Sequence, residues 1–335
     1  MVILPSQVRE QAEDWLSALV QHSSDLIIVV DEQGRVLYAN PVASVMFGVS
    51  LDEAIGMPAF RYVHPGDIGR VQTNLAAMVE SVGEPLADTI RVVSAAGDVR
   101  VLETITTNCL HDPGISGLVI NGRDVTERND YITRLEASFE AIASVVANVV
   151  ELRDPYTAGH QRQVAHIAGA VARDLDMADD EVHGIEVAAT LHDVGKIAIP
   201  AEILTRPGRL SVAEFELIKC HPEAGRQIVA EVPFPWPVAE MIVQHHERLD
   251  GSGYPSGLRG EAILVGSRVI AVADVVSAMS AHRPYRPAVG VGAALAEIEA
   301  GRGRRYDAAV VDSCLRLFRQ RAFPANPDGT PPTPG

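Results

Sequence analysis

A stretch from Leu191 to Pro255 holds the residues with the clearest capacity for chemistry. It contains an adjacent pair, His192-Asp193, a single His221, and a second adjacent pair, His245-His246, separated by helix-forming segments. Histidine and carboxylate suit borderline divalent metals such as iron, manganese or zinc. Neighbouring polar residues against an apolar core are costly unless they are paired or bind a metal. A lone histidine is more often an ordinary core residue, but this pattern predicts a metal site.

The segments around these residues predict a domain built only of helices. Thr157 or Gly159 can begin a helix that carries His160, and Asp179 or Asp180 can begin another that runs into the His-Asp pair. Both helices would place their polar residues beside an apolar face. From about residue 153 onward we therefore expect an all-α domain.

Two further helices are expected after the His-Asp pair. Ser211 and Glu214 form a capping-box pattern, in which both side chains satisfy free amides at a helix start. A mostly apolar helix from Val265 to Ser280 carries Asp274. An acidic residue in such surroundings is costly unless it has a partner, so Asp274 is expected to have one.

The first 125 residues predict a small α+β domain. Short β-branched runs alternate with turns, a capping box at Ser50 and Glu53 begins a short helix, and a longer helix is expected from Pro65 to Val82. The expected strands are Leu26 to Val30, Arg35 to Ala39, Leu86 to Val93, Val99 to Asn108 and Gly117 to Asp124.

A cleanly helical pattern joins these two regions. Between Asp130 and Leu152, apolar residues recur at spacings of three and four, which is the seam of a coiled coil. The seam consists of Ile132, Leu135, Phe139, Ile142, Val146 and Val149. We expect a parallel homodimer through this linker helix, and the alternative is an amphipathic helix packed on its own domain.

Composition limits the other partners. The chain has 335 residues, room for about two domains, and a formal charge of −16, which argues against binding polymeric nucleic acid. Its three cysteines are widely spaced and suggest neither disulfides nor a CxxC metal site. The only lysines are Lys196 and Lys219, a bias most simply attributed to genome composition. Without a signal peptide or an apolar run long enough for a membrane span, a cytoplasmic location is expected.

The N-terminal region resembles the PAS sensor fold. The strand order agrees with that family, as do the phrases Gly34-Arg35-Val36-Leu37-Tyr38-Ala39-Asn40, Val63-His64-Pro65-Gly66-Asp67 and Gly122-Arg123-Asp124-Val125-Thr126-Glu127-Arg128. The resemblance implies a five-stranded antiparallel sheet with helices over one face. The PAS ligand is unknown: His22, His64 and His111 are candidate haem ligands in principle, but an ordinary structural role is favoured. A domain that serves only for dimerisation is the alternative.

The histidine-rich region resembles two nested families. His192-Asp193 matches the signature of the HD phosphohydrolase superfamily. The later segments, His245-His246-Glu247 and Asp250-Gly251-Ser252-Gly253-Tyr254-Pro255, resemble the HD-GYP cyclic-di-GMP phosphodiesterases of bacteria. The resemblance covers about residues 145 to 322.

The resemblance implies a complete set of ligands for two divalent metal ions, with iron or manganese expected. One ion would be held by His160, His192, Asp193 and Asp274, and the other by Asp193, His221, His245 and His246. Asp193 would bridge the two. Two cations about 3.5–4 Å apart suit phosphodiester hydrolysis, because they hold the attacking and leaving oxygens together and acidify a water between them.

The same resemblance suggests roles for other polar residues. Lys196 would lie near the scissile phosphate, act in catalysis beside Asp193, and stabilise negative charge. Arg283 and Arg286 would reach substrate phosphates, and Tyr254 would line the pocket. Glu247 and Asp250 are interpreted as groups that orient the histidines.

Two positions depart from the family pattern. Tyr156 occupies the place where some members carry a carboxylate for a third metal, so two metals are predicted. Ser277 replaces an acidic residue three positions after Asp274, which would weaken a supporting hydrogen bond or change the rate.

The sequence as a whole predicts a multidomain protein. The expected parts are a PAS sensor at residues 13–127, a coiled-coil linker helix at 128–152, an HD-GYP phosphohydrolase at 153–322 and a disordered tail at 323–335. The expected activity is metal-dependent hydrolysis of cyclic-di-GMP to pGpG, and on to GMP in one version, under control of the PAS domain. The alternatives are a catalytically weak cyclic-di-GMP receptor and an enzyme for another cyclic dinucleotide.

Overall fold

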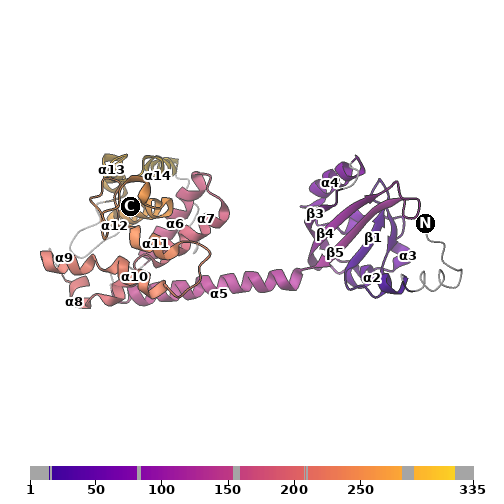
Figure 1. Ribbon diagram of the computed structural model, residues 1–335, viewed down its shortest axis with the longest axis horizontal. Coiled ribbons are helices and arrows are strands. Elements are labelled where there is room, and N and C mark those ends of the chain that lie inside the picture. The colour runs from indigo at the N-terminus through magenta and orange to yellow at the C-terminus, as the bar shows by residue number, and fades with distance from the viewer. Residues whose placement is uncertain are drawn as a thin grey trace, which may run out of the picture. The chain divides into compact units, whose positions relative to one another are not determined.

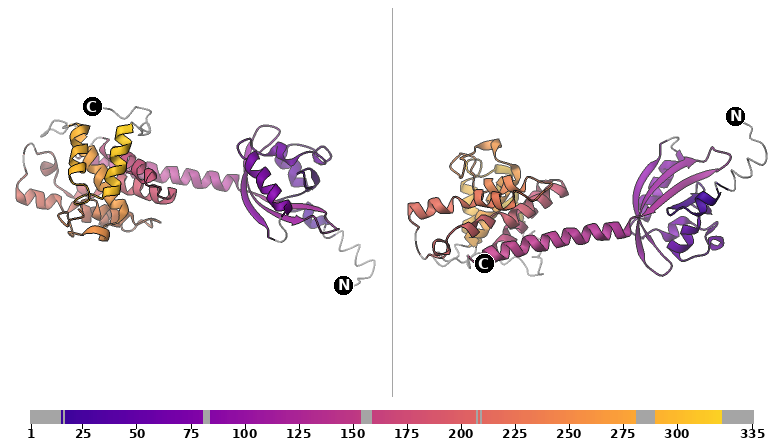
Figure 2. Two further views of the ribbon diagram at one scale, coloured as in Figure 1. Left: turned by 90° about the horizontal axis from the view of Figure 1, so that it is seen from above. Right: turned by 60° about the horizontal axis from the view of Figure 1, so that its bottom comes forward.

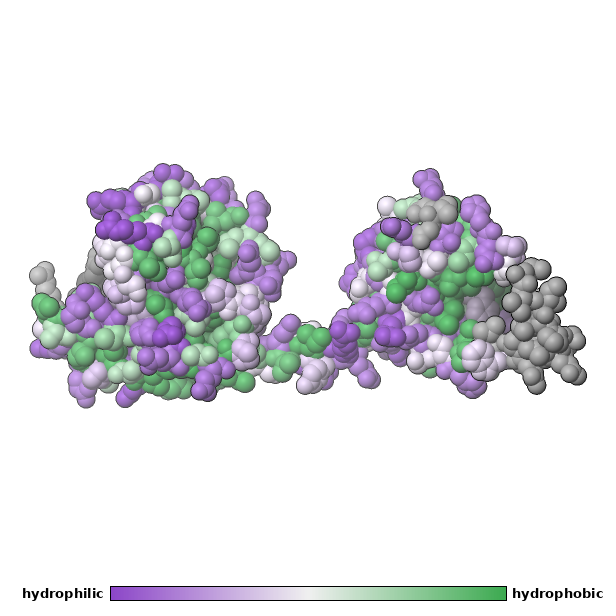
Figure 3. All heavy atoms as spheres, viewed as in Figure 1, coloured by the Kyte–Doolittle hydropathy of each residue, from purple (hydrophilic) through white to green (hydrophobic). Residues whose placement is uncertain are grey.

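The computed structural model describes residues 15, 17–80, 84–153, 159–206, 208, 210–280 and 290–320. It divides into two compact units, Met1–Glu136 and Ala137–Gly335 (Figure 1). Hydrophilic and hydrophobic residues are interspersed over the face of each unit seen in Figure 3. Within the described ranges, no helix is long and apolar enough to cross a bilayer.

A five-stranded antiparallel sheet forms the first unit, as predicted. The strand order is β2-β1-β5-β4-β3, and every neighbouring pair is antiparallel. The strands are β1 (Leu26–Val30), β2 (Val36–Ala39), β3 (Leu86–Val93), β4 (Val99–Cys109) and β5 (Gly117–Asp124). The first and last strands of the domain therefore pair at its centre, with Ile28 opposite Ile120.

Short helices cover one face of this sheet (Figure 2). They are α2 (Pro41–Phe47), α3 (Leu51–Ala54), the 3₁₀ turn η1 (Ala59–Tyr62) and α4 (Ile68–Glu80). The capping box predicted at Ser50 and Glu53 is present. Helix α4 is shorter than the predicted 65–82, and residues 81–83 lie outside the described residues.

An apolar cavity lies between these helices and the sheet. Its volume is about 90 Å³, and its walls include Leu26, Phe47, Leu75 and Ile90. None of His22, His64 and His111 is among its lining residues. Nδ1 of His64 instead accepts a hydrogen bond from the Gly66 amide, the local structural role expected for it.

Two buried polar side chains of the first unit, Asn40 and Asp67, are paired inside it. Asn40 is fully buried, and its side chain accepts from the Ile27 amide and donates to the Asp25 carbonyl. The Asp67 carboxylate accepts from the backbone amide, Nε and one Nη of Arg91.

Helix α5 (Thr126–Glu151) contains the predicted linker, but the predicted seam divides in two. Phe139 packs against the core of the second unit, together with the buried Ala143 and Val150. The other predicted seam residues are at least 36% exposed. Phe139 was therefore wrongly assigned to a dimer seam: a spacing of three and four does not distinguish two apolar faces of one helix.

The second unit is helical throughout its described part, as predicted. Its longer helices are α6 (His160–Asp174), α7 (Asp179–Leu191), α10 (His221–Val229), α11 (Val238–Gln244), α12 (Val265–Ser280), α13 (Val291–Ala300) and α14 (Ala308–Gln320). The shorter ones are α8 (Ala201–Leu204), α9 (Val212–Ile218) and the 3₁₀ turns η2 (Val194–Ala198) and η3 (Gly260–Ala262). Gly159 caps α6, and the Ser211–Glu214 capping box begins α9, both as predicted.

Candidate metal centre

Seven histidine and aspartate side chains from five separate segments meet inside the helical unit. Each sits at the end of a helix or in the turn after it, except for Asp274, which lies within α12. His160 is the first residue of α6, His192 and Asp193 follow α7, His221 is the first residue of α10, and His245 and His246 follow α11. All are buried except His246, which is half-buried.

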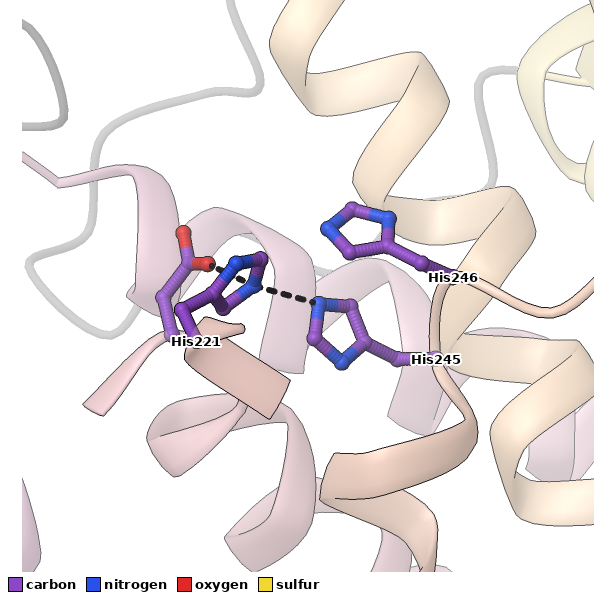
Figure 4. A group of neighbouring side chains, drawn as sticks. His221, His245 and His246 are labelled. Atoms are coloured by element: carbon purple, nitrogen blue, oxygen red, sulfur yellow. Dashed lines mark hydrogen bonds and ion pairs between the residues drawn. The ribbon is translucent and has the colours of Figure 1, made fainter. Parts of the chain in front are cut away.

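These seven residues form two neighbouring groups. One contains Asp193, His221, His245 and His246, and the other contains His160, His192 and Asp274. Within each group the candidate ligand atoms all lie within 4.8 Å of one another. The imidazoles of the first group come from two segments, the start of α10 and the turn after α11 (Figure 4).

Asp193 lies between the two groups. Its Oδ1 is 3.2 Å from Nε2 of His221, and its Oδ2 is 3.4 Å from Nε2 of His192. Lys196 Nζ, one 3₁₀ turn later, is 2.6 Å from Oδ2. The carboxylate that was predicted to bridge two metals thus has one oxygen toward each group.

Backbone carbonyls orient three of the histidines. Nδ1 of His192, His221 and His245 each donates to the carbonyl three residues earlier, at 2.6–2.7 Å. A carbonyl can only accept, so Nδ1 carries the proton and Nε2 keeps its lone pair. This is the tautomer in which Nε2 can bind a metal.

The charges of the site follow from burial and from its carboxylates. Burial lowers the pKa of His160, His246 and His245, in the last case to about 3, so these rings are neutral. Burial also lowers the pKa of His192, but the charge and hydrogen bond of Asp193, the charge of Asp274 and the hydrogen bond to the Ala189 carbonyl together outweigh it and leave that pKa raised.

Both carboxylates of the site are ionised. Burial would raise the pKa of Asp193, yet Lys196 and His192 hold it well below its usual range. Burial would also raise the pKa of Asp274, but His160, His246 and His192 together hold it well below its usual range, and its Oδ1 lies 3.2 Å from Nε2 of His160. Two buried carboxylates with one lysine favour further positive charge between them.

Two observations show that the site fits metal ions. Nε2 of His192 is fully buried and makes no hydrogen bond. Nε2 of His221 and Nε2 of His245 lie 3.4 Å apart, although both rings already donate from Nδ1 (Figure 4). When both rings carry only the Nδ1 proton, these nitrogens present lone pairs to each other, which is unfavourable in a buried site unless a cation lies between them. The donor set of imidazoles and carboxylates suits a divalent transition metal.

Comparison with known families agrees with this geometry. Residues 144–310 match the family model described as HD domain, and residues 20–130 match the one described as PAS fold. The chain carries a PAS domain followed by an HD domain.

Curated relatives match between about half and two thirds of the chain. The cyclic di-GMP phosphodiesterase response regulator RpfG of Xanthomonas campestris is 45% identical over 52% of this chain and 46% of its own length. A cyclic di-GMP phosphodiesterase of Thermotoga maritima is 36% identical over 57% and 52%, respectively. The 3'3'-cGAMP-specific phosphodiesterase 3 of Vibrio cholerae is 33% identical over 66% and 49%. The chain spans about half the length of these relatives.

Two glycines let the segments of the HD domain approach closely. A side chain at Gly195 would overlap the backbone at His221 and Gly225, so glycine is required where the His-Asp turn crosses α10. A side chain at Gly253 would overlap the backbone at His246 and Glu247. The Gly253-Tyr254-Pro255 segment therefore packs directly against the paired histidines.

Glu247 and Asp250 were predicted to orient the histidines, but their carboxylates make other contacts. The buried Glu247 carboxylate accepts from the amides of Ser256, Gly257 and Leu258 at 2.7–3.1 Å. Asp250 accepts from its own loop, at Ser252 N and Oγ. The Ile242 carbonyl already accepts from Nδ1 of His245, and these carboxylates instead hold the loop that carries Tyr254.

The remaining predicted residues fall at the edge of the site or outside the described residues. The Tyr254 ring lies 4.6 Å from the His246 ring, beside the first group. Arg283, Arg286 and Tyr156 lie outside the described residues, as does the predicted tail.

Sequence reasoning missed one hydrogen-bonded pair. Ser277 Oγ is 2.8 Å from Nδ1 of His160 and 2.8 Å from Oε1 of Gln163. Gln163 follows His160 by three residues on α6, a spacing that places both on one helical face and could have drawn attention to it.

Proposed function

We propose that the protein is a metal-dependent phosphodiesterase that opens cyclic-di-GMP to linear pGpG under control of its PAS domain. Further hydrolysis to GMP is the alternative endpoint. The observation that carries the proposal is the pair of adjoining His/Asp groups with uncompensated lone pairs. The relatives named cyclic di-GMP phosphodiesterases support it.

A second candidate substrate comes from one of the relatives. The Vibrio cholerae protein is named for 3'3'-cGAMP, another cyclic dinucleotide with the same phosphodiester linkages. Hydrolysis of both dinucleotides should therefore be measured side by side.

Two divalent ions, iron or manganese, are the proposed cofactors. The proposed ligands are His160, His192, Asp193 and Asp274 for one, and Asp193, His221, His245 and His246 for the other. When bound, such a pair acidifies water and neutralises charge on a phosphoryl oxygen. Asp193 would hold both, since its two oxygens face different groups.

The protein itself would contribute charge and orientation. Lys196 lies beside Asp193, where its ammonium would stabilise the charge that develops on the phosphate. Tyr254 would form a wall of the substrate pocket next to His246. Arg283 and Arg286 are proposed to bind the substrate phosphates through planar, bidentate contacts.

The first experiment is hydrolysis of cyclic-di-GMP by protein purified without oxygen, with iron or manganese supplied and bound metal counted. Product formation that disappears in Asp193→Ala would support the enzyme. Two bound metals without turnover of either dinucleotide would contradict it and favour the receptor. Metal retained in full by Asp193→Ala would show that the site lies elsewhere.

The proposed phosphate contact has its own test. Arg286→Ala should weaken dinucleotide binding about tenfold or more, because hydrogen bonds to charged groups contribute about 1.5–3 kcal/mol each. Its metal content should equal that of the wild type. Unchanged affinity would remove Arg286 from the proposed site.

A parallel homodimer through α5 is the proposed assembly. Leu135, Ile142 and Val149 are spaced by seven residues, and Val145 and Leu152 continue the heptad three residues later; all five are between 46% and 82% exposed. This stripe lies opposite the face buried by Ala143, Ala147 and Val150. A heptad on the solvent side of a helix is the pattern of a coiled coil.

Sedimentation tests the dimer. We expect wild-type protein to be dimeric at micromolar concentration and Ile142→Glu to shift it toward monomer, since a charge in the seam is costly. Ser144→Asp, which lies off the stripe, is the matched control. A monomeric wild type would contradict the proposal.

A further inference from the structure

Ser277 lies at the position where the sequence predicted a weakness in the metal site. It is fully buried on α12, one turn after Asp274. Its hydroxyl nevertheless contacts the ring of His160 at 2.8 Å. His160 is the one ring of the second group whose Nδ1 is held by a side chain, since His192 donates to a carbonyl.

The Ser277 hydroxyl also contacts the neutral side-chain amide of Gln163. Ser277 Oγ is also 2.8 Å from Oε1 of Gln163, so its proton can be donated there while its lone pair accepts from Nδ1 of His160. In this direction Nε2 of His160 is left with a lone pair, ready for a metal. Gln163 is exposed and free to adjust its amide.

The hydrogen bonds among Gln163, Ser277 and His160 can also run in the opposite direction. If the Gln163 amide turns over, its NH₂ donates to Ser277, and Ser277 then donates to Nδ1 of His160. The proton of His160 is then on Nε2, which lies 3.2 Å from Asp274 Oδ1 and can donate to it. A carboxylate at position 277 could only accept, so it would favour the metal-binding tautomer alone.

We infer that Ser277 and Gln163 form a reversible positioning pair for His160. The inference rests on the proposed metal function and deepens it. The pair makes the group of His160, His192 and Asp274 the weaker and more readily exchanged of the two metal positions. The other group lacks this freedom at His221 and His245, whose Nδ1 atoms face carbonyls that can only accept.

Metal binding by the apoprotein tests this directly. The wild type should bind manganese in two classes of different affinity. Ser277→Ala should weaken the weaker class about 10- to 100-fold, the usual effect of removing a partner that orients a ligand. Ser277→Asp should tighten that class about tenfold, while the tighter class stays unchanged in both variants.

The matched control is Ser267→Ala. Ser267 is equally buried on α12, but its hydroxyl reaches only the Met241 carbonyl, so both metal classes should be unaffected. Gln163→Leu should weaken the same class by less than Ser277→Ala, and the double variant should match Ser277→Ala alone, because the two residues act through one hydrogen bond.

The outcomes separate this inference from the proposed function. A wild type that binds no metal overturns both. A wild type with two metals, and a Ser277→Ala variant with the same two affinities, overturns only the positioning pair. Nitrogen-15 NMR of the metal-free protein adds a structural readout: Ser277→Asp should move the proton of His160 from Nε2 toward Nδ1.

A second observation concerns the two lysines of the chain. Lys196 touches Asp193, and Lys219 lies two residues before His221, so both flank the metal centre. Lys219 Nζ is 5.0 Å from the Phe215 ring centroid and 5.9 Å from that of Tyr254. An exposed ion pair with Glu216 holds it only weakly.

Phe215 extends the wall that Tyr254 begins. Its ring meets Tyr254 edge to face at 6.4 Å, and Tyr254 in turn lies against His246. Phe215 is 44% exposed, so a flat ligand can still reach it. An exposed aromatic ring beside a cation suits a purine base attached to a phosphate.

The geometry points to Phe215 as a stacking surface for one base of the cyclic dinucleotide, with Lys219 beside its phosphate. This too rests on the proposed function. Phe215→Ala should raise KM for cyclic-di-GMP about tenfold with unchanged metal content, because stacking on a base contributes in that range. Phe215→Tyr should keep the wild-type KM.

Val212→Ala is the control on the same helix. Val212 is 81% exposed, and KM should not change. An unchanged KM in Phe215→Ala would overturn the assignment while the wild-type activity stands. A wild type without activity or dinucleotide binding would overturn the proposed function and the assignment together.

Discussion

The two domains treat their buried polar groups in opposite ways. In the PAS domain, Asn40, Asp67 and Thr104 are buried, and each makes its hydrogen bonds within the domain. In the HD domain, Nε2 of His192 has no hydrogen bond, and two other Nε2 atoms lie 3.4 Å apart. These three PAS side chains have their partners within the domain, whereas the imidazoles of the HD domain favour a bound cation.

This difference separates a structural use of buried polarity from a functional one. A satisfied polar group stabilises a unique core, whereas an unsatisfied one costs free energy unless a ligand compensates. The PAS domain should therefore be indifferent to metal. The HD domain should depend on it for stability as well as for activity.

The largest expected effect comes from removing the shared carboxylate. Asp193→Ala should lower hydrolysis of cyclic-di-GMP on the order of 10³-fold, since it removes a charge from both groups at once. Metal analysis should show both positions depleted. The unfolding transition of the PAS domain, followed by calorimetry, should not move; a shift there would break the contrast between the domains.

Removal of the metal should have the next largest effect, on the stability of the HD domain. A chelator should lower the free energy of unfolding of the HD domain by about 3 kcal/mol, the value expected when free metal had been about 100-fold above its dissociation constant. Calorimetry with and without chelator measures it. Asp193→Ala should be insensitive to the chelator, and equal destabilisation of both domains would count against the comparison.

A third test removes a hydrogen-bonded ion pair, Asp67 with Arg91, from the PAS domain. Asp67→Asn should lower the free energy of unfolding of that domain by about 2 kcal/mol, because it weakens three hydrogen bonds around Arg91. Metal content should stay at the wild-type level. Urea unfolding of the metal-loaded protein distinguishes the domains.

Lowering the pH should weaken the Asp67–Arg91 pair and destabilise the PAS domain. Hydrogen bonds from Arg91 lower the pKa of Asp67, so the folded state holds the ionised form more firmly than the unfolded chain does. The stabilisation is present above the ordinary carboxyl pKa and is lost as pH falls toward the lowered value. Asp67→Asn should therefore flatten the acid side of the stability profile of the PAS domain.

The smallest effect is expected at Thr104. Its hydroxyl donates to the Asp88 carbonyl at 3.1 Å across the β3–β4 pair. Thr104→Val keeps the shape and loses one neutral hydrogen bond, so about 1 kcal/mol should be lost. A much larger loss in chemical denaturation would mean that this group supports more than its own contact.

The elements of both domains were largely predictable, because their signals are local. Strands Leu26–Val30, Leu86–Val93 and Gly117–Asp124 and helix Val265–Ser280 have the predicted bounds. Alternation, capping boxes and glycine stops act within a few residues of one another. Local spacing could not say which side of α5 would be buried, since that depends on the domain against which it packs.

The amino-acid sequence by itself determined which side chains could bind metal, because histidine and aspartate at these positions limit the chemistry. The tertiary structure alone decided how they divide into two groups, which nitrogen of each ring carries its proton, and that Glu247 holds a loop. It also placed Ser277 between His160 and Gln163. The contacts of Ser277 join residues over a hundred positions apart, and the other features depend on backbone amides and carbonyls whose direction exists only once the segments are packed.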